Sequence, residues 1–244
     1  MRTIFAVALF LFAQQGMGPG PGTAHSAGGG GGKAFVQANT NFGTTTTTTT
    51  VPVTSSGAGH FLVADCGIDS TTATLSISDN LSDTWTASTA TTEAVFNMQQ
   101  RVFYLPNSPS GVTSVTCTST VTAPSNIMMV VEEFSGVATS SVLDGTQQNA
   151  TTRGFANPAL WTTPSITTTN ATDLIIQADA DGSATTFSAS TGFTLPAGGS
   201  SSTGNHRNVA LQYKIVSSTG TYAPTGSFTV GGNSNTLVSM VAFK

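Results

Sequence analysis

The stretch that decides the fold reads Asn126-Ile127-Met128-Met129-Val130-Val131-Glu132-Glu133-Phe134. Successive side chains of a β-strand point to opposite faces of its sheet, so the odd-numbered residues form one face and the even-numbered residues the other. Both faces are apolar up to the two glutamates, which predicts a central strand that is covered on both sides. The last stretch, Thr236–Lys244, is also apolar on both faces, so we expect the C-terminal strand in the middle of a sheet.

Outward from this strand, the chain consists of short apolar or alternating runs separated by turn residues at a spacing of roughly 8 to 12 residues. No segment keeps a helical period over three turns. This pattern predicts an all-β protein, an antiparallel two-sheet β-sandwich of jelly-roll type with about 10 to 12 strands. The other predicted strands are His60–Ile68, Ala73–Ser78, Thr84–Ser88, Ala94–Leu105, Val112–Thr122, Asp173–Ala180, Thr185–Ala189, Asn208–Ser217 and Ser227–Val230.

The composition supports this class. Of 244 residues, 7 are Lys or Arg and 11 are Asp or Glu, whereas 44 are Thr and 28 are Ser. Soluble domains normally carry about 25% charged residues, and abundant Thr is typical of strands. The formal net charge of −4 without a basic cluster makes nucleic acid an unexpected partner. Outward strand positions hold Thr and Ser instead of the charges that protect sheets from edge-to-edge association, which favours self-association or packing against another surface polymer.

The N-terminus has the order of a secretory signal peptide. A basic residue precedes the apolar run Ile4–Ala13, and a small-x-small site occurs at Gly22-Thr23-Ala24. We therefore predict a signal peptide at 1–24, a Gly-rich flexible tether at 25–32 and a single β-sandwich domain at 33–244. The alternative for the apolar run is a buried first strand or short helix. No later run is long enough to span a bilayer, so the mature chain is expected to be extracellular and not embedded in a membrane.

The seven-threonine run Thr44–Thr50 has two interpretations, an edge or strand-flanking segment and an extended linker. We favour the strand, because Val51-Pro52-Val53 follows and proline is tolerated at edges.

The chain has two cysteines, Cys66 and Cys117, each on the apolar face of a predicted strand. An exported chain with an even number of cysteines usually oxidises them, so we predict a disulfide, which would stabilise the fold by about 4 kcal/mol in the chain-entropy model. The alternative is two reduced, separately buried thiols. The spacing of cysteines and histidines does not suggest a zinc site.

Catalytic patterns are sparse. The sequence has no G-x-S-x-G elbow, and its histidines do not suggest a Ser–His–carboxylate triad. The histidines are His25, His60 and His206. A glycosidase needs two carboxylates, which Asp65, Glu132 or Glu133 could supply, but the adjacent glutamates face opposite ways and cannot pair with each other. We therefore predict no catalytic residue and a protein that is not an enzyme.

A calcium site is the one metal site that the sequence suggests. Asp179 and Asp181 are spaced i, i+2 and are followed by Gly182, as at the start of a calcium loop, although further ligands are lacking. The alternative is an acidic turn, and no other cofactor is expected. The segment Asp79–Asp83, for which calcium is also conceivable, is interpreted first as a hairpin turn between two alternating runs.

Three motifs carry a resemblance: Leu75–Thr86 with Asp79 and Trp85, Val102-Phe103-Tyr104-Leu105-Pro106-Asn107, and Val131–Val137 followed by Leu143-Asp144-Gly145. Together they resemble a secreted bacterial β-sandwich domain of uncharacterised surface proteins, whose members often show D-x-x-G-N-x-W, F-Y and E-x-S-G at these places. Here Ser82-Asp83 replaces Gly-Asn. The resemblance covers most of 61–244 and implies a fold and an extracellular setting. It implies no activity.

Three function classes remain. The first is a structural or interaction protein of the cell surface, either an extracellular filament or coat subunit or an adhesin-like domain, in which residues 33–43 could be donated as a strand to a neighbour. The second is a carbohydrate-binding module that would present Trp85 or Trp161 to a polysaccharide. A glycoside hydrolase is the third and least favoured.

Overall fold

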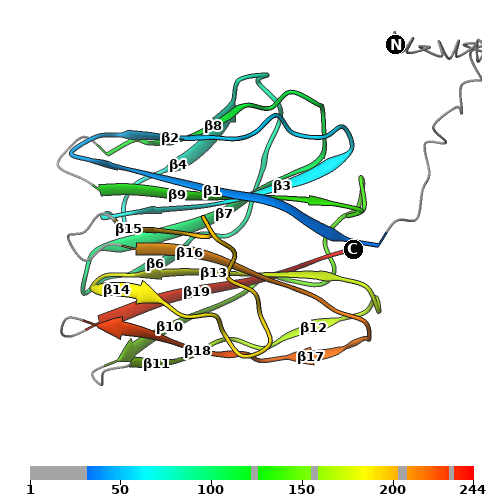
Figure 1. Ribbon diagram of the computed structural model, residues 1–244. Coiled ribbons are helices and arrows are strands. Elements are labelled where there is room, and N and C mark those ends of the chain that lie inside the picture. Colours follow the sequence, from blue (N-terminus) through cyan, green and yellow to red (C-terminus); the bar gives the residue numbers. More distant parts are fainter. Residues whose placement is uncertain (1–31, 122–125, 155–158, 203–207, 231–233) are drawn as a thin grey trace, which may run out of the picture. The chain divides into compact units, whose positions relative to one another are not determined.

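The computed structural model describes residues 32–121, 126–154, 159–202, 208–230 and 234–244 (Figure 1). Within these ranges the chain forms nineteen strands, all paired antiparallel, and no helix. Nothing in them could therefore cross a membrane as a helix. The predicted all-β sandwich class is confirmed, although the strands outnumber the prediction because several have only two or three residues. The predicted signal peptide and all of the predicted tether except Gly32 lie outside the described ranges.

The first half of the chain builds two sheets. Major sheet 1 has the order β1-β9-β3-β7-β5, with β6 also paired to β7, and minor sheet 1 has the order β2-β8-β4. The bounds in major sheet 1 are β1 Ala34–Thr44, β9 Asn126–Ser135, β3 His60–Ile68, β7 Met98–Ser108, β5 Thr86–Ala87 and β6 Thr91–Glu93. Those in minor sheet 1 are β2 Thr48–Pro52, β8 Ser114–Ser119 and β4 Leu75–Asp79. Strand β9 contains the stretch quoted first, and its position between β1 and β3 confirms that it is central.

The second half builds major sheet 2, with the order β10-β19-β13-β16-β15, and two smaller sheets, β11-β18-β14 and β12-β17. The bounds in major sheet 2 are β10 Gln148–Gly154, β19 Ser234–Phe243, β13 Leu174–Asp181, β16 Asn208–Ile215 and β15 Ser200–Ser202. Those of the smaller sheets are β11 Ala159–Thr162, β18 Thr225–Val230, β14 Ala184–Phe187, β12 Ile166–Thr168 and β17 Gly220–Tyr222. The C-terminal strand β19 lies between β10 and β13, as expected from its two apolar faces.

The sheets stack in layers (Figure 1). An apolar cluster that we call the interlayer core fills the space between the two major sheets and includes Phe61, Val130, Phe134, Leu211 and Phe243. A second cluster joins major sheet 1 to minor sheet 1, and a smaller one joins major sheet 2 to β12 and β17. Each major sheet is therefore covered on both faces, which explains why its central strands are apolar throughout.

The two halves repeat one topology. In both major sheets the first strand of the half, β1 or β10, pairs with its last strand, β9 or β19. The last strand then pairs with β3 in the first half and with β13 in the second half. The register repeats as well, because Phe61 is opposite Phe134 and Leu174 is opposite Phe243. The chain thus contains an internal duplication, whereas the jelly-roll assignment stays a prediction.

The repeat can also be followed in the rings of the interlayer core. Tyr104 precedes Phe134 by the same number of residues as Tyr213 precedes Phe243. Tyr104 packs against Phe243 with ring centroids 5.1 Å apart, and Tyr213 packs against Phe134, also at 5.1 Å. Each tyrosine therefore contacts the phenylalanine of the other half, so the halves pack against each other as two related copies would in a symmetric dimer.

The threonine run has the favoured strand or strand-flanking character, because Thr44 ends β1 and Thr48–Thr50 begin β2, an edge strand that continues into Val51 and Pro52. The run is divided at Thr45, which turns in the left-handed region with φ 55°. One local prediction changes. The segment Asp79–Asp83 is not a hairpin turn, because β4 pairs with β8 in minor sheet 1 and β5 pairs with β7 in major sheet 1. The turn instead carries the chain from one layer to the next.

Candidate functional site

The most unusual chemistry lies inside the interlayer core, where Asp65 and Glu132 are fully buried. Asp65 is opposite Val130 and Glu132 is opposite Val63, so the two carboxyl groups are diagonal neighbours on one face of major sheet 1. None of their four oxygens has a hydrogen-bond partner among the described residues. Burial raises the pKa of both carboxyls well above the ordinary range, and the charge of Asp179 adds to the effect on Asp65. Burial therefore favours the neutral, protonated form of both groups over the charged form.

The internal repeat shows that the fold does not require these acids. By register, Asp65 corresponds to Ala178 of β13, and Glu132 corresponds to Val241 of β19. Ala178 and Val241 face the same core and are buried apolar residues. Since a buried polar group without a partner costs about 1 to 3 kcal/mol, the first half carries an energetic burden that the second half avoids.

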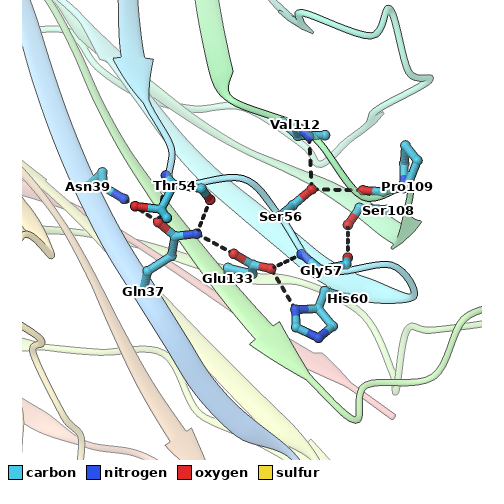
Figure 2. A network of polar contacts seen from close by, with 10 residues as sticks. All are labelled: Gln37, Asn39, Thr54, Ser56, Gly57, His60, Ser108, Pro109, Val112 and Glu133. Atoms are coloured by element: carbon cyan, nitrogen blue, oxygen red, sulfur yellow. Dashed lines mark hydrogen bonds and ion pairs between the residues drawn. The ribbon is translucent and has the colours of Figure 1, made fainter. Parts of the chain in front are cut away.

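Glu133, the neighbour of Glu132, faces the other way and is the centre of a polar network (Figure 2). Its Oε1 accepts hydrogen bonds from the amide of Gly57 at 2.9 Å and from Nδ1 of His60 at 2.6 Å. Its Oε2 accepts a hydrogen bond from Gln37, whose amide also pairs with the backbone of Thr54. The buried carboxylate thus fastens the 54–59 loop to β1, β3 and β9. His60 is partly exposed, whereas His25 and His206 lie outside the described residues.

A second pair of acids lies where β1 begins. Asp144 accepts hydrogen bonds from the amide and hydroxyl of Thr169 and has a lowered pKa, first because of a hydrogen bond with Asp173. Burial, with the adjacent Asp144, raises the pKa of Asp173 to about 7. Lys33 partly offsets that rise and donates a hydrogen bond to the carbonyl of Thr172. These contacts attach the start of β1 to the second half.

The residues predicted for calcium are buried in β13 and do not form an exposed turn. Asp179 accepts hydrogen bonds from the side-chain amides of Gln177 and Gln212, and burial raises its pKa to about 7. Asp181 accepts hydrogen bonds from the amide of Ser183 and the hydroxyl of Thr236. No group of three or more metal-ligating His, Cys, Asp or Glu side chains occurs in the described part of the chain.

The predicted disulfide between Cys66 and Cys117 is present, with the two Cα atoms 6.4 Å apart. It connects β3 of major sheet 1 to β8 of minor sheet 1 through the apolar cluster that these sheets share. Both cysteines point into this cluster, as strand alternation predicted.

Trp85 does not stand on an open face. It is half-buried against the cluster beneath minor sheet 1, and its Nε1 donates a hydrogen bond of 2.8 Å to Asp79. The other oxygen of Asp79 accepts hydrogen bonds from the amides of Leu81 and Asp83. The Asp and Trp of the first quoted motif thus act together to fix the crossover between layers. Trp161 lies in β11, where its backbone is opposite Gly226 of β18. The side chain of Trp161 is outside the part of the chain that the structure describes.

Sequence reasoning missed the repeat, the partners of Glu133 and the acid pair at Asp144. The equal Tyr–Phe spacing was the one signal that could have shown the repeat. No family model, curated protein or solved structure matches this chain, so the resemblance to secreted bacterial surface domains stays a prediction.

Proposed function

We propose that this chain is a secreted, non-enzymatic structural or interaction protein of the cell surface that works by associating with copies of itself, as a filament or coat subunit or an adhesin-like domain does. The observation that carries the proposal is the outer face of minor sheet 1. It is a flat array of hydroxyl groups without a charged side chain, next to an unpaired strand edge.

The array has two rows across the three strands. Thr48 is opposite Thr118, which is opposite Ser76, and in the next row Thr50, Thr116 and Ser78 are aligned in the same way. The Oγ1 atoms of Thr50 and Thr116 lie 2.8 Å apart. Serine and threonine lose little solvation when such a face is covered, compared with Lys or Glu, so the face can be buried against another flat surface at low cost.

The edge beside the array is β4, which pairs only with β8 among the described strands. Its one charged residue, Asp79, is engaged by the turn that follows and by Trp85. Edge strands of soluble monomers normally carry charges, proline or a bulge that prevents pairing with another chain. An edge strand whose one charged side chain is engaged within the chain, beside an uncharged face, supports assembly.

If copies of the chain assemble by strand donation, they must exchange β1 with one another. Strand β1 pairs with β9 of its own chain along its length. Its backbone is also approached by Gly198, where a Cβ would lie 2.5 Å from the carbonyl oxygen of Ala38. Donation would therefore swap β1 between copies instead of adding a strand to an open edge.

Two observations weigh against the other candidates. Trp85 is anchored inward, so it is poorly placed as a polysaccharide platform. Asp65 and Glu132 have no exposed surface, so a polysaccharide cannot reach the carboxyl groups considered for hydrolysis.

The test uses the mature chain from residue 25, with a charge placed on the outer face by Ser76→Lys. The matched control is Ser140→Lys in the exposed connection between the halves. Light scattering and electron microscopy should show assembly of the parent and the control and a monomer for Ser76→Lys. A second variant lacking residues 25–43 tests strand exchange, because that route predicts loss of assembly. A parent chain that stays monomeric up to millimolar concentration would refute the proposal.

A further inference from the structure

Two adjoining cavities open where the two halves meet beside β5. Their volumes are about 370 and about 330 Å³, near the lower end of the range for small-ligand sites. Tyr104 and Leu143 line both cavities, so both side chains border the place where the cavities adjoin. Leu143 is 41% exposed, which is high for a large apolar side chain that contacts a core.

The lining combines apolar surface with neutral hydrogen-bonding groups. The apolar part comes from Tyr104, Pro106, Val142, Leu143 and Val241. The polar part comes from Thr86, Ser88, Thr89, Ser141, Thr146 and Gln147. No Asp or Glu side chain lines either cavity, and Lys244 is the one charged residue. Since the lining is uncharged apart from Lys244, which borders one of the two cavities, the groove suits a ligand that makes mainly uncharged contacts through an apolar face and several hydroxyl groups.

A comparison of the two halves indicates which shape of ligand would fit beside Leu143. In the counterpart place, Phe35 is stacked on Tyr213 with ring centroids 5.2 Å apart and planes 5° from parallel. Phe35 is opposite Phe134, and Leu143 forms the corresponding bridge to Phe243. Leu143 thus takes the place of Phe35 beside Tyr104. A leucine lacks the planar extent of a phenyl ring, and the space beside it is open to solvent.

We propose that this groove, which we call the seam groove, binds a neutral oligosaccharide, with sugar rings lying on either side of Leu143. The apolar face of a pyranose ring would pack against Leu143 and the exposed edge of Tyr104, a residue that is 7% exposed and whose ring packs against Phe61 and Phe243. The hydroxyl groups of the sugar would pair with the threonines and serines at the rim, since the side-chain amide of Gln147 is already bonded to the backbone of Thr89. The site lies apart from the outer face of minor sheet 1, so either proposal can fail without the other.

The alternative to a sugar is an aromatic side chain of another protein, or of a second copy of this chain, which could also place a ring in the seam groove. The lining favours the sugar, because a single aromatic side chain would fill one cavity and leave the rim hydroxyls of the other unused. Two adjoining cavities of similar size match successive rings of a chain of sugars.

The experiment titrates the mature chain with cello-, malto-, xylo- and laminari-hexaose and with an acidic oligogalacturonide, measured by calorimetry. At least one neutral hexaose should bind, and the acidic one should bind at least about tenfold more weakly. Leu143→Phe, which restores the counterpart ring, should weaken binding at least about tenfold, the scale of a misfit by one carbon group in a pocket. Thr146→Trp at the exposed rim should do the same, which covers the case in which Leu143→Phe does not fold. The matched control Val95→Phe adds a ring at a remote residue that is 59% exposed and should leave binding unchanged.

Three results would overturn the proposal. The first is no binding of any neutral hexaose at millimolar concentration. The second is binding that persists in both groove variants. The third is concentration-dependent association of the parent that Leu143→Phe abolishes without any effect of sugar, because the groove would then hold a protein side chain.

Discussion

The buried pair of Asp65 and Glu132 makes the stability of the protein depend on pH in an unusual direction. Both pKa values are raised above their ordinary values of 3.8 and 4.5, chiefly by desolvation. Between its ordinary and its raised pKa, each group holds more protons in the native state than in the unfolded state. The stabilisation is therefore complete below the ordinary pKa and is lost as the pH rises through the raised pKa.

The size of this pH dependence follows from the one proton that each carboxyl group binds. While the pH lies between the ordinary and the raised pKa of one of these carboxyls, that group lowers the free energy of unfolding by about 1.4 kcal/mol per pH unit, so the pair lowers it by about 2.7 kcal/mol per pH unit where the two ranges overlap. Asp179, whose pKa is raised to about 7 mainly by burial, adds to the fall. A fall of this size over one pH unit is a large share of the 5 to 15 kcal/mol that is typical of a folded protein.

The assay is urea unfolding from pH 4.5 to pH 8 for the parent, Asp65→Ala, Glu132→Val and the double variant, which carry the residues that the second half uses at these positions. Each single variant should flatten the slope by about 1.4 kcal/mol per pH unit, so its stability relative to the parent should increase as the pH rises. Glu132→Gln keeps the size of the side chain and removes its titration, so it should flatten the slope as much as Glu132→Val. Parallel pH curves for the parent and the double variant would refute the reasoning.

Three further predictions concern the contacts that join the layers. Replacing both Cys66 and Cys117 by alanine should lower the free energy of unfolding by about 4 kcal/mol, measured in urea against the oxidised parent, and a loss below 1 kcal/mol would show that the bridge does not restrain the unfolded chain. Glu133→Leu should cost about 1 to 3 kcal/mol, because it removes the acceptor of three partly buried donors, whereas Glu133→Gln should cost less; equal losses would contradict a hydrogen-bonding role. Trp85→Phe should cost about 1 kcal/mol through the lost hydrogen bond to Asp79, and the same substitution in an Asp79→Ala background should cost clearly less if the two side chains act together.

The candidate site could be predicted only in part. Strand alternation placed Glu132 and Glu133 on opposite faces, and the structure has them there. It could not show that the face of Glu132 is closed by a second sheet, because the central strands of that sheet, β13, β16 and β19, begin more than forty positions further along the chain. The partners of Glu133 come from β1, β3 and a loop, and no spacing in the sequence brings these segments together.

The sequence by itself determined the all-β class, the central position of β9 and β19 and the pairing of Cys66 with Cys117. These features follow from which side chains leave water and from the strict two-residue period of a strand. The tertiary structure alone decided how the layers are joined. Asp79–Asp83 became a crossover and not a hairpin, because pairing partners are chosen among strands that are far apart in the chain. The duplicated halves, and the open seam groove beside Leu143 where its counterpart Phe35 closes the space, likewise exist only once the two major sheets face each other.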